Sequence, residues 1–260
     1  MLLTVDAGNT NIVLAVYEKD ELLYRARIYS ERRKTDDQYA YEFKQILGEE
    51  YGKNRDYEGA IISSVVPEIT KRLEYAAKAV TGKDPVVLGV GVKTGLRING
   101  VNRGELGADL VAGAVGAKLK YKMPCLIWDL GTCTKISVLN EKGEFMGCTI
   151  SPGINMSIEA LGTNTSQLNA IKVSEYSKPF GNTTVASISS GVIVGTAVML
   201  EGLSRRIIDE MGYKDVTVVV TGGLAPVILP ALKTDVIHNK NLLSEGLCAV
   251  FEYNREVSHE

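Results

Sequence analysis

Apolar and polar residues along this chain form two kinds of pattern: short apolar runs, and longer stretches in which apolar residues recur every three or four positions. The short runs predict strands at 2–5, 12–17, 22–28, 60–66, 85–88, 125–128, 136–139, 144–150, 216–220 and 236–237. The helical spacing predicts helices over 36–52, 68–81, 108–121, 189–208 and 244–254. Strands interleaved with helices in this way are typical of an α/β protein.

The two halves of the chain repeat one order of elements. Each half has an apolar strand, a D-x-G-[NT] turn, a second strand, a charged turn and a third strand. The turn begins at Asp6 in the first half and at Asp129 in the second half, 123 residues later. Because this spacing is close to half of the chain, it indicates an internal duplication at the scale of a domain. We therefore expect two related lobes, which comprise residues 1–117 and 118–260.

Both turns have the composition of a loop that binds phosphate. A glycine allows backbone to come close to an anion, and successive N–H groups can hold phosphate oxygens. An aspartate at the end of a strand, as Asp6 is, suits a hydrated Mg²⁺, which keeps its waters and needs few carboxylates. One such motif is explained as well by an ordinary Asp-Gly turn. The second copy, together with Thr221-Gly222-Gly223 after a later strand, favours two loops that clamp a nucleotide.

Composition narrows the chemistry. With 45% hydrophobic residues the chain is not intrinsically disordered as a whole, and we expect neither a signal peptide nor an apolar run of the 18–20 residues or so that a spanning helix needs. A formal net charge of −2 and one short basic run at 32–34 argue against a nucleic-acid partner. Two histidines, and four cysteines without a C-x-x-C pair, argue against a histidine triad, a zinc site and disulfides. The cysteines are expected to be reduced core thiols, so carboxylates and backbone amides must carry the chemistry.

These motifs together resemble the actin-like ATPase superfamily and, within it, the type III pantothenate kinases. The resemblance covers nearly the whole chain and rests on segments 6–10, 93–97, 105–109, 129–134, 151–153, 181–184 and 221–223. It implies two ribonuclease-H-like lobes with a cleft between them. It also implies ATP-dependent phosphorylation of the hydroxyl of pantothenate, the first step of coenzyme A biosynthesis. The implied cofactors are ATP, Mg²⁺ and a monovalent cation, K⁺ or NH₄⁺. The implied assembly is a cytoplasmic homodimer with the acceptor site at its interface, and no membrane partner is expected.

The resemblance also implies roles for individual residues. Thr132 matches an ATP contact, and the first phosphate segment consists of Asp6, Ala7, Gly8, Asn9, Thr10, Asn11, Ile12 and Val13. Asp109 matches the catalytic base, because phosphoryl transfer needs one carboxylate to accept the proton of the acceptor hydroxyl. The first turn of a helix also favours an aspartate, and the two roles are compatible. Asp129 matches the ligand of the monovalent cation, and Asp6 is associated with Mg²⁺, directly or through water. The substrate-binding residues are Gly107, Ala108, Asp109, Leu110 and Thr184, the last across the dimer interface.

One loop departs from the family's pattern, Y-x-N-P-x-E-x-G-A-D-R. Here the tyrosine is replaced by Gly100, the proline by Arg103 and the arginine by Leu110. The missing tyrosine and arginine are implicated in holding pantothenate, and loss of a buried charged donor costs on the order of 2–5 kcal/mol. Lys135 stands where a threonine is common, and it could either reach a phosphate or point to solvent. Two alternatives therefore stay open: a kinase for another small hydroxylated substrate, and a nucleotide-binding regulatory protein without pantothenate kinase activity.

Overall fold

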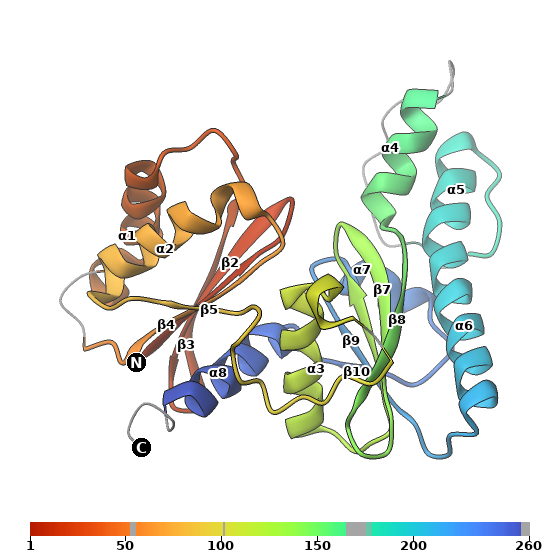
Figure 1. The fold of residues 1–260 in the computed structure, drawn as a ribbon. Helices are drawn as coiled ribbons and strands as arrows, with labels where there is room; N and C mark the ends of the chain where they lie inside the picture. Colours follow the sequence, from red (N-terminus) through yellow and green to blue (C-terminus); the bar gives the residue numbers. More distant parts are fainter. Residues whose placement is uncertain (53–55, 101, 165–175, 177, 256–260) are drawn as a thin grey trace. The chain divides into compact units, whose positions relative to one another are not determined.

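The computed structural model describes residues 1–52, 56–100, 102–164, 176 and 178–255. The chain forms two compact units (Figure 1). Unit 1 comprises Met1–Leu96, Val101–Leu119 and Asn241–Glu260, and unit 2 comprises Arg97–Gly100 and Lys120–Lys240.

Unit 1 is built on a five-stranded sheet with the order β3-β2-β1-β4-β5. Its strands are β1 (Leu2–Ala7), β2 (Asn11–Glu18), β3 (Glu21–Tyr29), β4 (Gly59–Ser64) and β5 (Val86–Val87). The first three strands form an antiparallel meander, and β4 lies parallel to β1. The helices of this unit are α1 (Asp36–Tyr51), α2 (Pro67–Thr81), α3 (Ala108–Lys120) and α8 (Leu242–Arg255), with a 3₁₀ turn, η1 (Arg103–Glu105).

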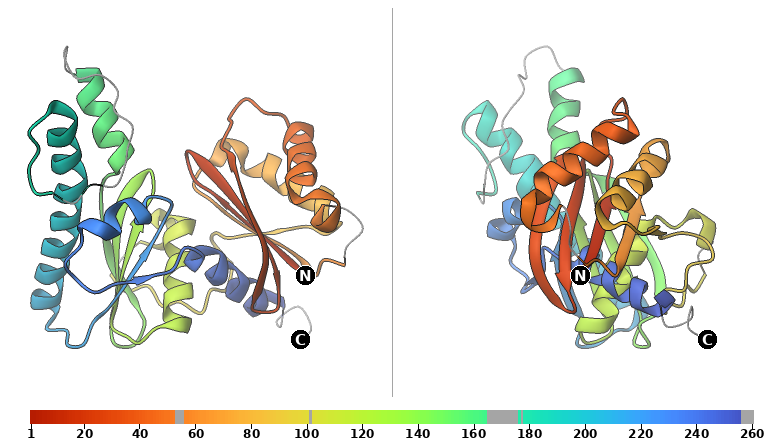
Figure 2. Two further views of the ribbon diagram at one scale, coloured as in Figure 1. Left: turned by 180° about the vertical axis from the view of Figure 1, so that it is seen from behind. Right: turned by 90° about the vertical axis from the view of Figure 1, so that its left-hand side faces the viewer.

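Helices cover both faces of the unit 1 sheet (Figure 2). The buried residues of α1 and α2 pack on the face that carries Leu3 and Val5. The other face meets α8, since the Tyr17 hydroxyl lies 2.7 Å from the Ser244 hydroxyl. This division follows the two-residue period of a strand, because neighbouring side chains point to opposite faces. It explains why β1 and β2 consist of almost continuous apolar runs.

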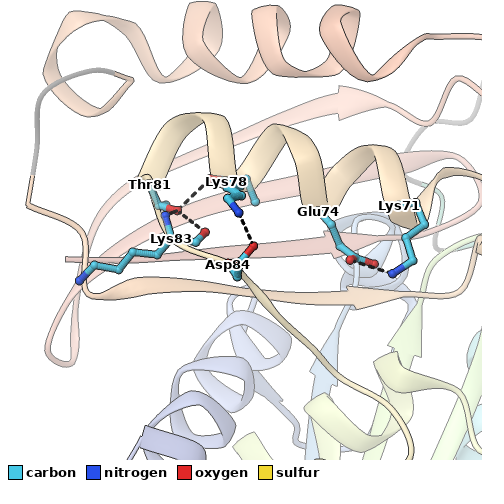
Figure 3. A network of polar contacts seen from close by, with 7 residues as sticks. Lys71, Glu74, Lys78, Thr81, Lys83 and Asp84 are labelled. Atoms are coloured by element: carbon cyan, nitrogen blue, oxygen red, sulfur yellow. Dashed lines mark hydrogen bonds and ion pairs between the residues drawn. The ribbon is translucent and has the colours of Figure 1, made fainter.

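Local signals in the sequence mark the start of α1 and both ends of α2, the helices that cover the first face. Thr35 caps α1 through a capping box with Gln38, in which each side chain bonds to the other residue's backbone N–H. Pro67 starts α2, and Gly82 ends it in the left-handed conformation with φ +71°. The outer surface of α2 is charged: Lys71 pairs with Glu74 at 3.0 Å, and Lys78 pairs at 2.7 Å with Asp84, which follows the helix (Figure 3). Exposed pairs of this kind contribute little to stability, so this surface is a solvated face.

Unit 2 repeats the sheet of unit 1. Its order, β10-β9-β6-β7-β8, again places the first strand of the unit in the centre, between its second and fourth strands. The strands are β6 (Cys125–Leu130), β7 (Cys133–Leu139), β8 (Phe145–Pro152), β9 (Thr217–Thr221) and β10 (Ile237–His238). The helical elements are α4 (Ile154–Asn164), α5 (Thr184–Ser189), a π turn η2 (Ser190–Val194), α6 (Gly195–Met211), α7 (Ala225–Ile228) and a 3₁₀ turn η3 (Leu229–Ala231). The α/β fold of two related units expected from the sequence is confirmed.

Three features differ from the expectations. The C-terminal helix α8 belongs to unit 1, whereas the predicted C-terminal lobe, 118–260, includes it. The segment Thr184–Met211 is helical throughout and, by length and composition alone, could cross a membrane. The sequence predicts a helix over 189–208 but no spanning run, because its apolar residues are interspersed with Ser, Gly and Thr. Cys148 is exposed and is therefore not a core thiol, whereas Cys125 is buried.

Candidate active site

The first phosphate segment is a braced hairpin at the end of β1. The Gly8 N–H donates to the Asn11 carbonyl at 2.9 Å and closes the loop between β1 and β2. Ser30, just after β3, donates its N–H to the Thr10 carbonyl at 3.0 Å and its hydroxyl to the Gly8 carbonyl. The side chains of Asn9 and Thr10 are exposed at the tip. The loop carbonyls thus accept hydrogen bonds from within the protein, while polar side chains at the tip remain accessible to a ligand.

The second phosphate segment repeats this bracing. The Gly131 N–H donates to the Cys133 carbonyl at 3.1 Å, as Gly8 does to Asn11. The Gly153 N–H, just after β8, donates to the Thr132 carbonyl at 3.1 Å, as Ser30 does to Thr10. The D-x-G-[NT] repeat in the sequence therefore marks a repeated backbone arrangement, and the second loop is one residue shorter than the first.

A third bond ties each hairpin to the segment that follows the fourth strand of its unit. In unit 1 the Val65 N–H donates to the Ala7 carbonyl at 3.0 Å, and in unit 2 the Leu224 N–H donates to the Leu130 carbonyl at 2.9 Å. Thr221, the last residue of β9, pairs in register with Asp129. The structure therefore brings the Thr221-Gly222-Gly223 turn next to the second phosphate segment, in unit 2.

Glycines make these close backbone approaches possible. A side chain on Gly222 would place its Cβ 2.6 Å from the Leu130 carbonyl carbon, and its φ of +93° is a conformation that L-residues rarely adopt. A Cβ on Gly153 would lie 2.6 Å from the Gly131 carbonyl oxygen. Alanine does not fit at either position without moving the backbone of Leu130 or of the Gly131–Thr132 loop.

Asp109 lies in the first turn of α3, and Gly107 fixes the space beside its carboxylate. The Gly107 carbonyl accepts the Val111 N–H at 3.2 Å, and Asp109 Oδ1 accepts the Leu110 N–H at 2.8 Å. A Cβ on Gly107 would lie 2.6 Å from Asp109 Oδ1 and 3.7 Å from Val65 Cγ1. Because Val65 is also bonded to Ala7, Asp109 lies at the same end of the unit 1 sheet as the first phosphate segment.

Asp129 is paired with a lysine. Lys135 lies opposite Asp129 in the register of β6 and β7, and its Nζ donates to Asp129 Oδ2 at 2.9 Å. Only 18% of the Asp129 side chain and 13% of the Lys135 side chain are exposed. The sequence left Lys135 undecided between phosphate and solvent, and the register of the hairpin was the signal that could have shown the pair.

The acidic residues of the described structure do not form a ready-made metal cage. Among the described residues no three Asp, Glu, His or Cys side chains cluster in a way that could hold a metal. Asp6 alone would still suffice for Mg²⁺, because this ion can be held through one or two carboxylates, waters and the phosphates of a substrate. The environment of Asp129 does not suit a monovalent cation, since the Lys135 ammonium already occupies one of its oxygens.

The remaining acceptor-side residues are distributed over both units. Leu110 is half-buried in α3 of unit 1, whereas Thr184 is exposed at the start of α5 in unit 2, next to the cap residue Thr183. Gly100 has φ +72°, a conformation that would strain the tyrosine of the family's pattern. The Arg103 side chain lies outside the described part of the structure.

Comparisons with known proteins identify the family of the chain. The family model described as "Type III pantothenate kinase" matches residues 2–206. A type III pantothenate kinase from Brevibacillus brevis is 37% identical over 257 residues, which cover 98% of this chain and 100% of the relative.

Two solved structures share the fold at low sequence identity. One, described as a Baf-family transcriptional activator from Campylobacter jejuni, has a TM-score of 0.61 at 18% identity and covers 98% of this chain and 99% of its own. The other is an inorganic polyphosphate/ATP-glucomannokinase from Arthrobacter sp. strain KM, with a TM-score of 0.51 at 15% identity and 98% coverage of both chains. At these identities they show the fold alone, which is the actin-like fold of sugar kinases. The family model and the relative from Brevibacillus show more: the chain belongs to the type III pantothenate kinase family.

Proposed function

We propose that the two braced hairpins and Asp109 carry out the reaction of this family, transfer of the terminal phosphoryl group of ATP to the hydroxyl of pantothenate. The observation that carries the proposal is the repeated hairpin. Each unit holds a glycine-containing loop in one backbone arrangement by the same three hydrogen bonds. Each loop offers N–H groups and a hydroxyl that suit phosphate oxygens, that of Thr10 in unit 1 and that of Thr132 in unit 2.

Phosphoryl transfer needs positioning and neutralisation of charge more than covalent chemistry. The loops that contain Gly8 and Gly131 supply the positioning, because their carbonyls are bonded within the protein and their geometry is fixed before a ligand binds. Asp6, at the end of β1, is the residue that would hold Mg²⁺ through water. Bound there with ATP, the ion would neutralise charge on the phosphates.

Asp109 is the proposed base. Its carboxylate is oriented by the Leu110 N–H and by the absence of a side chain at Gly107. It lies at the end of the sheet where the first phosphate segment is found, so the proton of the acceptor hydroxyl would pass to an Asp109 oxygen as the oxygen of the alcohol attacks phosphorus. Gly107, Ala108 and Leu110 would line the acceptor site, with Thr184 contributed across a dimer interface.

We infer that the chain works as a homodimer. The helical segment Thr184–Met211 buries one side in the core of unit 2, through residues such as Val192 and Leu200. Its other side carries Val185 and Val198, which are 56% and 60% exposed. A second copy is the partner we propose for this face, since packing side by side would bury these residues. A cytoplasmic location accords with this interpretation, because one side of the helix belongs to a protein core.

The test replaces Asp109 by asparagine and measures two quantities. Asp109→Asn should abolish pantothenate-dependent formation of ADP, while the affinity for nucleotide, measured by calorimetry, stays within a few-fold of the wild type. Asp36→Asn is the matched control, because Asp36 also lies in the first turn of a helix, α1. Equal losses of turnover and nucleotide affinity would contradict the role of Asp109. Turnover of a different alcohol only, or nucleotide binding without any turnover, would favour the two alternatives left open by the acceptor loop.

A further inference from the structure

The pair between Asp129 and Lys135 joins two opposite residues of the second phosphate segment. Opposite residues on neighbouring antiparallel strands have side chains on the same face, so the register of β6 and β7 places these two side chains together. In the register of β1 and β2 the position opposite Asp6 is Val13, which has no charge. The lysine is therefore a feature of this one hairpin rather than of the repeated fold.

The surroundings of the pair make the ammonium a fixed charge. Both side chains are more than four-fifths buried, and Nζ lies 2.9 Å from Oδ2, which is the length of a charge-assisted hydrogen bond. Buried pairs are screened by salt much less than exposed pairs. Dissolved ions therefore compete poorly with the Lys135 ammonium for the Asp129 carboxylate.

We propose that the Lys135 ammonium takes the place of a monovalent cation on Asp129, so that this kinase works without added K⁺ or NH₄⁺. The inference rests on the proposed function only in assuming that a positive charge beside Asp129 assists nucleotide binding. A lysine ammonium is an ammonium ion in which one hydrogen is replaced by an alkyl chain, so it supplies the charge and the N–H donors of NH₄⁺. A second cation at the same carboxylate would be repelled by it.

The experiment compares KCl with tetramethylammonium chloride at equal ionic strength, because the tetramethylammonium ion has no N–H donors. Turnover of pantothenate and the dissociation constant of the Mg²⁺–ATP complex are both measured. The wild type should differ by less than about twofold between the two salts, which is small beside the tenfold change that 1.4 kcal/mol produces. Lys135→Ala should lose about tenfold or more in nucleotide affinity in tetramethylammonium chloride, and KCl or NH₄Cl should restore it.

Two further variants control the comparison. Lys142→Ala removes an exposed lysine from the turn between β7 and β8, and it should behave as the wild type in both salts. Lys135→Met removes the charge but keeps a long side chain in the same space, and K⁺ should restore its affinity less than that of Lys135→Ala. Circular dichroism melts show whether each variant is folded.

Three outcomes would overturn the proposal. The first is a gain of about tenfold or more in turnover or nucleotide affinity when K⁺ is added to the wild type. The second is a folded Lys135→Ala variant whose nucleotide affinity K⁺ does not restore, and the third is a Lys135→Met variant whose affinity K⁺ restores as fully as that of Lys135→Ala. If neither the wild type nor any variant turns over pantothenate in any of the salts, the proposed function fails instead. The salt dependence of nucleotide affinity then still decides the role of Lys135.

Discussion

Replacement of Gly107 by alanine should move the Asp109 carboxylate while leaving the rest of the fold in place. The new Cβ would lie 2.6 Å from Asp109 Oδ1, and ordinary contact begins at 3.4 Å, so the oxygen must shift by about 0.8 Å. The next nearest atom is Val65 Cγ1, at an acceptable 3.7 Å. The Asp109 side chain can rotate, whereas the backbone has no need to move. A misplacement of about 1 Å can cost about 100-fold in rate, and we expect a fall in kcat of that order.

The assay is pantothenate-dependent release of ADP at saturating ATP, with nucleotide affinity and Tm measured on the same protein. Gly107→Ala should lower kcat and leave nucleotide affinity and Tm close to those of the wild type. Gly104→Ala is the matched control in the same loop, since its Cβ would meet Asn102 Oδ1 at an ordinary 3.5 Å. An unchanged kcat in Gly107→Ala would refute the role given to the carboxylate. A fall in Tm as large as that of a core mutation would refute the argument that only the Asp109 side chain has to move.

Leu110→Arg should restore a buried charged pair with pantothenate worth about 2 kcal/mol, and so lower the KM for pantothenate by about 30-fold. An unchanged KM would mean that other residues hold the acceptor. Gly222→Ala should weaken nucleotide binding and lower Tm, because its φ of +93° and the nearby Leu130 backbone leave no room for a Cβ; Gly195→Ala, whose Cβ meets no described atom within 4 Å, should do neither. Burial raises the pKa of the Cys125 thiol from 9.0 to about 12, so above pH 9 the unfolded chain releases a proton that the folded chain keeps. The free energy of unfolding should therefore fall by up to about 1.4 kcal/mol per pH unit from this group between pH 9 and 12, and Cys125→Ala should flatten the dependence of Tm on pH there.

The parts of the site that the sequence predicted are those encoded locally. Asp6 and Asp129 each follow an apolar strand and precede a glycine, and this order of residues alone is enough to specify a strand, a tight turn and a second strand. The repeat of the motif 123 residues later indicated two related units, and the two sheets have the same strand order. The proposed roles of Asp109 and Thr132 remain predictions, because geometry without a ligand does not test them.

The parts that the sequence did not predict depend on contacts between distant segments. The C-terminal helix α8 joins unit 1 because Gly246 and Gly116 let its backbone approach α3, with the Gly246 N–H 3.2 Å from where a Cβ on Gly116 would lie. Neither glycine indicates in the sequence which helix it packs against, because helical spacing describes one helix at a time. The bond from Gly153 to Thr132 joins the end of one strand to a loop two strands earlier, and it was not predicted for the same reason.

The two hairpins show how a duplicated site can change its requirements while its backbone is preserved. The glycines and the three bracing bonds recur because a phosphate loop needs backbone in one geometry, which tolerates few substitutions. The residues opposite the aspartates face no such constraint, and they have become Val13 in one copy and Lys135 in the other. A lysine at that position adds a charge without moving the loop, since its ammonium reaches Asp129 from the neighbouring strand. A dependence on dissolved cations can therefore be lost through one side chain, whereas loss of the nucleotide site would require the backbone itself to change.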